Sequence, residues 1–337
     1  MTVAAPSRLV TMDDIQGAAA ALAGVAVRTP LLPVDALSDR LGVSVFVKPE
    51  NLQRVGAFKL RGAYNLVRQV GTGSRGVITY SSGNHGQAVA YAARLFGLRV
   101  VIVMPETVTA AKRSGVERLG GEVVLAGRTS KDRYEKAMEI AGREGLEVIP
   151  PFDHPAIIAG QGTVGLEIVA DCPTVQTVCV PTGGGGLSAG VATAVHHLAP
   201  EARVITVEPE GAAKLATSLK QGRRVVLDKT ASIADGLITL SVGELNWEHL
   251  SRYVARGVTV SEDALRQAVR FALERLKLVV EPSGAATLAW LMGQDMGAFK
   301  GPVVAILSGG NVDWDGLADV MSVFRPPVPP SPRPPSS

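Results

Sequence analysis

Cysteine is almost absent from this chain of 337 residues. Its two cysteines, Cys172 and Cys179, are too few for a disulfide framework or for a structural zinc site of the usual kind, and they are typical of a protein in a reducing compartment. No stretch reaches the roughly 18 consecutive apolar residues of a membrane-spanning helix, and residues 1–7 lack a basic segment followed by an apolar one. We therefore expect a cytoplasmic protein with no signal peptide and no membrane partner.

A surplus of charge of one sign is also lacking. The 34 Lys and Arg residues exceed the 31 Asp and Glu residues by three, which gives a net charge of +3. So small a surplus excludes nucleic-acid binding driven by bulk charge. The content of 46% hydrophobic and 19% charged residues is instead typical of a globular protein with a substantial core. At roughly 100–200 residues per domain, the length allows about two domains.

Strand-like and helix-like segments alternate along the chain. The expected strands are short β-branched runs bounded by turn residues: Val45–Val47, Gly76–Tyr80, Val100–Met104, Glu122–Leu125, Val175–Pro181, Ala202–Glu208 and Val303–Ser308. The expected helices have apolar residues at helical spacing: Gly86–Phe96, Thr109–Arg118, Ser130–Arg143 and Ser261–Arg275, the last with Ser261 as its N-cap. This alternation predicts an α/β fold with parallel sheets covered by helices on both faces, and a binding crevice at the carboxyl ends of the strands.

Three glycine-rich turns follow expected strands: Ser81–Gly86, Pro181–Ser188 and Ser308–Asn311. The second turn contains four successive glycines, more backbone freedom than a connection needs. Consecutive N–H groups without side chains form a nest for an anion, and the dipole of the following helix favours a phosphate. Tight packing alone is the alternative for this turn, and the third turn by itself is equally typical of a simple strand end.

A lysine in an unusual setting accompanies these turns. Lys59 lies beside Phe58 and among small residues, and a desolvated lysine has a lowered pKa and becomes a nucleophile toward an aldehyde. Because the turns carry neither a Walker lysine nor a dinucleotide signature, a phosphate site with such a lysine favours pyridoxal phosphate as the cofactor. Taken alone, Lys59 is also consistent with an ordinary helix lysine whose amine reaches solvent.

Several motifs then resemble one family in their order along the chain. They are Lys48–Asn65, Ser81–Gln87, Ala159–Thr163, Gly183–Leu187, Ile233–Gly236, Glu281–Gly284 and Ser308–Asp313. Together they are similar to the serine/threonine dehydratases and serine racemases, which are pyridoxal-phosphate enzymes of fold type II. The resemblance covers about residues 10–320.

The resemblance implies a role for each matching residue. Lys59 would hold the cofactor as a Schiff base and then act as base and acid at the α-carbon of the substrate. The other residues that would contact the cofactor are Phe58 and Gly236 on the two faces of its ring, Asn84 at its ring oxygen, Gly183, Gly184, Gly185 and Gly186 at its phosphate, and Ser308 at its pyridine nitrogen. The residues that would surround the substrate carboxylate are Ser81, Ser82, Gly83, Asn84 and His85.

The resemblance also implies a domain organisation. A large cofactor-binding domain would comprise residues 1–52 and 149–324, and a small domain, residues 53–148, would be inserted into it. Residues 325–337, almost entirely proline, serine and arginine, would form a disordered tail, with a ligand for a proline-binding domain as the alternative. We expect a homodimer or a higher homo-oligomer.

The implied activity is that of an L-threonine/L-serine ammonia-lyase acting on a small β-hydroxy amino acid. The neutral hydroxyl of Ser308 would leave the pyridine nitrogen largely unprotonated, which favours prompt loss of the β-hydroxyl to give a 2-oxo acid and ammonia. A serine racemase is the alternative, with Ser82 as the catalytic proton donor on the face opposite Lys59. A hydroxyaspartate dehydratase, a synthase of the β-replacement kind and a relative without activity also stay open.

A divalent cation is left undecided by the sequence. Racemase-like members of the family bind one through a glutamate after a strand and a later aspartate. Glu208 fits the first position and is the one candidate ligand, but Lys214 fills the later position. A lysine ammonium in the place of the cation, paired with Glu208, is the expectation, with an ordinary surface pair as the alternative.

Overall fold

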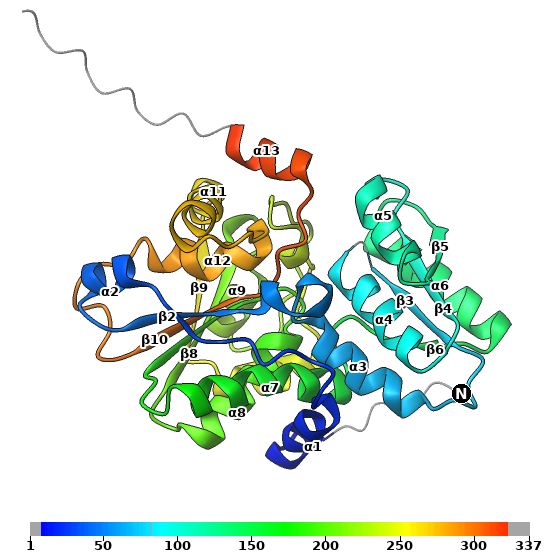
Figure 1. The fold of residues 1–337 in the computed structure, drawn as a ribbon, viewed down its shortest axis with the longest axis horizontal. Helices are drawn as coiled ribbons and strands as arrows, with labels where there is room; N and C mark the ends of the chain where they lie inside the picture. Colours follow the sequence, from blue (N-terminus) through cyan, green and yellow to red (C-terminus); the bar gives the residue numbers. More distant parts are fainter. Residues whose placement is uncertain (1–7, 82, 323–337) are drawn as a thin grey trace, which may run out of the picture.

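The computed structural model describes residues 8–81 and 83–322, so that both Ser82 and the proline-rich segment 325–337 lie outside the described residues. Two sheets form its framework (Figure 1). Strands and helices alternate as the sequence predicts, and the α/β class with helix-flanked parallel sheets is confirmed. Each element below keeps the label of Figure 1.

The larger sheet has six strands in the order β1-β2-β10-β7-β8-β9. These strands are β1 (Leu32–Pro33), β2 (Val45–Pro49), β10 (Val303–Leu307), β7 (Thr177–Pro181), β8 (Arg203–Pro209) and β9 (Arg256–Val260). All neighbours pair in parallel except β1, which runs antiparallel to β2 at one edge. The sheet is therefore mixed at that edge, although the sequence indicated only parallel pairing.

The smaller sheet is parallel throughout, in the order β5-β4-β3-β6. Its strands are β5 (Glu122–Leu125), β4 (Val100–Met104), β3 (Val77–Tyr80) and β6 (Glu147–Val148). All four come from one continuous stretch of chain, residues 77–148. The strands of the larger sheet come from both sides of that stretch.

The helices lie on both faces of the two sheets. They are α1 (Met12–Leu22), α2 (Asp35–Leu41), α3 (Lys59–Val70), α4 (Asn84–Leu95), α5 (Ala110–Glu117), α6 (Ser130–Glu144), α7 (Pro155–Asp171), α8 (Gly186–Leu198), α9 (Lys214–Gln221), α10 (Glu244–Tyr253), α11 (Glu262–Phe271), α12 (Pro282–Leu291) and α13 (Trp314–Ser322). Short turns complete the fold: η1 (Glu50–Leu52), η2 (Arg54–Gly56), η3 (Glu210–Ala212), η4 (Asp235–Leu237) and the π-helical η5 (Ala272–Leu276). Within the described ranges, every helix falls short of the combined length and apolar character that a bilayer crossing requires.

Burial on both faces explains why the central strands are apolar at every position. In β10, Val303, Ala305 and Leu307 pack into a core shared with α11 and α12, while Val304 and Ile306 pack into a second core with α7 and α8. The smaller sheet repeats this pattern, with α3 and α4 on one face and α6 on the other. A strand covered by helices on both sides needs apolar side chains at odd and even positions alike.

Helix starts agree with the capping residues in the sequence. The Thr109 hydroxyl accepts a hydrogen bond from the backbone N–H of Lys112 at the start of α5, and that of Ser261 accepts one from Ala264 at the start of α11. Such caps satisfy N–H groups that the first helical turn leaves without partners. The predicted helix Ser261–Arg275 therefore begins where expected, but its last part is the π-helical turn η5.

Candidate active site

Two of the three glycine-rich turns follow strands whose carboxyl ends share an edge. Because β10 and β7 are parallel neighbours, the turns after them, Ser308–Asn311 and Thr182–Gly186, lie at the same end of the sheet. This edge is where ligands bind in open α/β sheets. The turn after β3 belongs to the smaller sheet and leads into α4.

The segment that carries Lys59 pairs directly with the turn after β10. The Phe58 N–H donates to the carbonyl of Ser308 at 3.1 Å, and Ala57 forms an isolated antiparallel bridge with Gly309. Lys59 then begins α3. The structure therefore brings Phe58, Lys59 and Ser308 together, although 249 residues separate the last two in sequence.

The Lys59 amine is held in a partly buried position. Its Nζ donates to the carbonyl of Pro151 at 2.8 Å and lies 5.1 Å from the centroid of the Phe58 ring. Burial lowers the pKa of Lys59 to about 8, against the opposing attraction of Glu281. A lysine with this pKa is a better nucleophile near neutral pH than a solvated one, which supports the prediction over an ordinary helix lysine.

The tetraglycine turn packs closely against Gly236 and Phe152, without room for side chains at Gly183 and Gly184. A Cβ at Gly183 would lie 2.6 Å from the carbonyl oxygen of Gly236, and one at Gly184 would overlap the ring of Phe152. Phe152 follows Pro151, the residue that accepts the hydrogen bond from Lys59. The lysine, the glycine turn and Gly236 are thus connected through direct neighbours.

The turn also presents a free helix N-terminus. Gly185, with φ +99°, occupies the N-cap position of α8, and no side chain in the described part of the chain caps this helix. The first N–H groups of α8, which begins at Gly186, have no partner inside the helix and are suited to an anion. Asn246 holds the turn, since its Nδ2 donates to the carbonyl of Gly184 at 2.8 Å.

Asn84 belongs to a partly buried polar group whose contacts the sequence prediction missed. Its Nδ2 donates to Glu281 Oε1 at 2.6 Å, and its Oδ1 accepts from Asn311 Nδ2 at 2.9 Å. Burial, reinforced by the charge of Asp235, raises the pKa of Glu281 to about 8. Glu281 and Asn311 lie in motifs that carried the resemblance, but nothing in the sequence showed that they meet Asn84 across 197 and 227 residues.

The turn after β3 is described except for Ser82. The Gly83 N–H donates to Ser81 Oγ at 3.2 Å. His85 is buried, and its Nε2 lies 3.2 Å from the carbonyl of Ile149, so this nitrogen must carry the hydrogen. Burial and the nearby Lys59 lower the pKa of His85 to about 3. The imidazole is therefore neutral at physiological pH, and its Nδ1 has no partner among the described residues.

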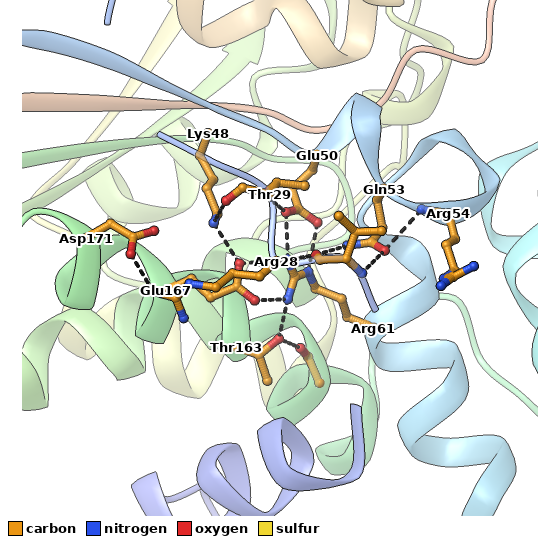
Figure 2. A network of polar contacts seen from close by, with 12 residues as sticks. Arg28, Thr29, Lys48, Glu50, Gln53, Arg54, Arg61, Thr163, Glu167 and Asp171 are labelled. Atoms are coloured by element: carbon orange, nitrogen blue, oxygen red, sulfur yellow. Dashed lines mark hydrogen bonds and ion pairs between the residues drawn. The ribbon is translucent and has the colours of Figure 1, made fainter. Parts of the chain in front are cut away.

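A cluster of buried charges lies under the first turn of α3 (Figure 2). The Arg61 guanidinium contacts both oxygens of Glu50 at 2.8 Å and those of Glu167 at 2.6 and 2.9 Å. The Lys48 amine adds an ion pair to Glu167 at 2.6 Å. Lys48, Glu50 and Arg61 are almost inaccessible to solvent, and the two positive and two negative charges cancel. This cluster fixes the start of α3, and with it Lys59.

The expected pairing of Glu208 with Lys214 is present and fully buried. The Lys214 Nζ lies 3.0 Å from Glu208 Oε1 and also donates to three backbone carbonyls, including those of Thr182 and Leu237. Both oxygens of Glu208 accept further hydrogen bonds from the N-terminus of α9. The surface-pair alternative is therefore wrong. This arrangement does not fit a divalent cation, because the Lys214 ammonium already binds the Glu208 carboxylate and the carbonyl oxygens that would be its ligands.

Comparison with known proteins identifies the family. Residues 22–309 match the model of the pyridoxal-phosphate dependent enzymes, and the chain belongs to this family. The chain is 40% identical over 309 residues to an L-threonine ammonia-lyase of Thermotoga maritima, a match that covers 90% of this chain and 76% of that protein. It is 37% identical to a serine racemase of Schizosaccharomyces pombe, over 93% of this chain and 98% of the relative.

A solved structure supports the same family. The structure of maize serine racemase superposes with a TM-score of 0.89 at 35% identity, covering 94% of this chain and 98% of that one. The predicted resemblance and the type II fold are confirmed. The chain spans only 50% of the length of the biosynthetic threonine dehydratase of Solanum lycopersicum that it also matches.

The residues of the site fit the cofactor that the family implies. Pyridoxal phosphate needs a phosphate cradle and an amine. The helix α8 begins at Gly186 without a side-chain cap from the described residues, which leaves its first N–H groups for an anion, and Lys59 supplies an amine with a lowered pKa.

Proposed function

We propose that this chain is a pyridoxal-phosphate-dependent ammonia-lyase for L-threonine or L-serine. The observation that carries the proposal is the connection of Lys59, through Pro151 and Phe152, to the tetraglycine turn. A nucleophilic amine is thereby held beside an anion cradle. The 40% identity to the Thermotoga maritima L-threonine ammonia-lyase supports the choice of substrate and reaction.

Each residue of the site has its own role in the proposed reaction. When bound, the cofactor withdraws electrons from the substrate α-carbon. Lys59 is the covalent attachment point and removes the α-proton, and the N–H groups of the glycine turn orient the phosphate. Ser308 would donate a hydrogen bond to the pyridine nitrogen but keep its proton, so that the nitrogen stays uncharged. Asn84, aligned by Glu281, would bind the ring oxygen.

The substrate carboxylate is proposed to bind the turn after β3, through Ser81, Ser82, Gly83, Asn84 and His85. Since the pKa of His85 is lowered to about 3, its ring is neutral and acts through hydrogen bonds rather than through charge. Phe58 and Gly236 would cover the two faces of the ring. The domain division at residues 53 and 149 is proposed with it, because the smaller sheet lies within residues 77–148.

Racemisation is the second candidate, favoured by the match to the serine racemase of Schizosaccharomyces pombe over nearly the full length of both proteins. It requires a proton donor on the face opposite Lys59, and Ser82 is proposed for this role. In either reaction the buried Lys214 ammonium, rather than a divalent cation, would join the glycine turn to the segment after Gly236. The cytoplasmic location and the homo-oligomeric state stay predictions from the sequence.

A substrate panel tests the proposal. The holoenzyme is incubated with L-threonine, L-serine, D-serine and 3-hydroxyaspartate, and both 2-oxo acid release and the chirality of the remaining amino acid are measured. Release of 2-oxo acid from L-threonine or L-serine is expected. Formation of D-serine from L-serine would establish the racemase activity, whereas the absence of both products would refute the proposed function.

A further inference from the structure

Lys112 and Asp235 form an ion pair between two distant parts of the chain. Lys112 lies on α5, which packs against β5 and α4 of the smaller sheet, whereas Asp235 begins η4, which packs against α12 beside the larger sheet. The Lys112 Nζ lies 2.6 Å from Asp235 Oδ2. The pair therefore connects the smaller sheet to the turn that contains Gly236.

Few other polar side chains join residues 77–148 to residues 177–322, although Arg61, which precedes that stretch in the proposed small domain, contacts Glu50 and Glu167. Within residues 8–81 and 83–322, the side-chain hydrogen bonds and ion pairs between residues 77–148 and residues 177–322 involve only Asn84 and Lys112 on the first side. The contacts of Asn84 lie in the proposed site. Lys112 supplies the one charged contact among them.

The electrostatic surroundings of the pair extend to the site. Burial lowers the pKa of Lys112, but the negative charges of Asp235, Glu281 and Asp313 more than offset it, so the pKa lies above its usual value. Asp235 in turn raises the pKa of Glu281, the carboxyl that contacts Asn84. Lys112 lowers the same pKa, so the two charges of the ion pair oppose each other at this carboxyl, and the two side chains are 29% and 50% exposed.

We propose that the Lys112–Asp235 ion pair is a positioning contact that closes the α5 side of the molecule over the site and breaks to exchange substrate and product. This inference rests on the proposed function. Exposed ion pairs typically shift an equilibrium by about 2–5-fold, which is strong enough to bias closure and weak enough to be broken in each turnover. The closed arrangement would keep Gly236 against the ring and water out of the site.

Kinetics of charge variants test this role. Lys112→Met and Asp235→Asn are each expected to raise KM for the amino-acid substrate about 2–5-fold with little change in kcat. The charge swap Lys112→Asp with Asp235→Lys is expected to return KM toward the wild-type value. Raising the salt concentration to about 0.5 M should raise the wild-type KM and leave that of Lys112→Met unchanged. The matched control is Arg113→Met, since the partner of Arg113, Glu117, lies on the same helix at 2.8 Å.

A second measurement does not depend on turnover. Hydrogen–deuterium exchange of the holoenzyme should be faster in residues 110–117 and 233–239 of Lys112→Met than in those of the Arg113→Met control. Equal exchange and equal KM in the two variants would overturn the proposal, and so would a charge swap as impaired as the single variants. If exchange responds as expected but neither L-threonine nor L-serine is turned over, the positioning contact stands and the proposed function fails.

Discussion

Replacing Arg61 with methionine tests the cluster of buried charges under α3. The change removes a guanidinium with 1% of its side chain exposed and leaves the Glu50 carboxylate, which is fully buried, without its main partner. Glu167 keeps its ion pair with Lys48. The formal charge of the cluster changes from zero to −1, and methionine occupies much of the vacated volume, so that the electrostatic loss dominates.

The expected loss follows from the burial of the partners. Removing one member of a buried ion pair typically costs about 3–5 kcal/mol, because the remaining charge stays in a poorly solvating environment. Since proteins are stable by about 5–15 kcal/mol, Arg61→Met should lose a large part of the free energy of unfolding. Arg61→Lys keeps the charge but loses the bidentate geometry, so its free energy of unfolding should lie between those of the wild type and Arg61→Met.

Urea unfolding followed by circular dichroism is the assay, with the double variant Arg61→Met/Glu50→Gln as the control. The double variant removes the unpaired charge and should be more stable than Arg61→Met alone, since residues in contact are not additive. The reasoning would be refuted if Arg61→Met lost less than about 1 kcal/mol of unfolding free energy. It would also be refuted if the loss in the double variant equalled the sum of the losses in Arg61→Met and Glu50→Gln measured singly.

Four further predictions concern the site. Lys59→Ala should abolish turnover and the borohydride-stable cofactor label, and a label on another lysine would contradict the assignment. Gly184→Val should raise the cofactor dissociation constant at least about tenfold in a fluorescence titration, because its side chain would overlap the Phe152 ring and displace the turn, and unchanged retention would refute the phosphate site. Burial and Asp235 raise the pKa of Glu281 to about 8, so that from about pH 4.3 to 8 the folded cofactor-free protein holds a proton that the unfolded chain releases. Its free energy of unfolding should fall as pH rises through this range in urea titrations, and Glu281→Gln should flatten the slope. Ser82→Ala should stop conversion of L- to D-serine and spare elimination from L-serine, and equal loss of both in chiral product analysis would make Ser82 structural.

Segments with clear periodicity were predictable from the sequence. The strands β4 and β5 have the predicted bounds. The helices α5 and α6 begin and end within about one residue of the predicted positions, because a capping threonine precedes each helix and the apolar residues follow a helical spacing. Helices such as α12 gave no such signal. All ten of its residues are buried, and a helix that is apolar on every side has no amphipathic period to detect.

Contacts across long sequence separations were not predictable from the residues alone. The Schiff-base lysine, the glycine turns and Ser308 could be named from motifs, but not the packing of Gly184 against Phe152 or the hydrogen bond from Asn84 to Glu281. These contacts depend on the register and packing of two sheets. Pattern and propensity report only which face is buried, not which distant residue lies opposite.

The order of the strands in the larger sheet differs from the order in which they are synthesised. β10 lies between β2 and β7, yet it is the last strand of the described chain to leave the ribosome. Until then β2 and β7 each expose an unpaired edge, and such edges favour association with other chains. The smaller sheet comes from one continuous stretch and can form as soon as residue 148 emerges. Nascent chains halted before residue 303 are therefore the species most in need of chaperone protection.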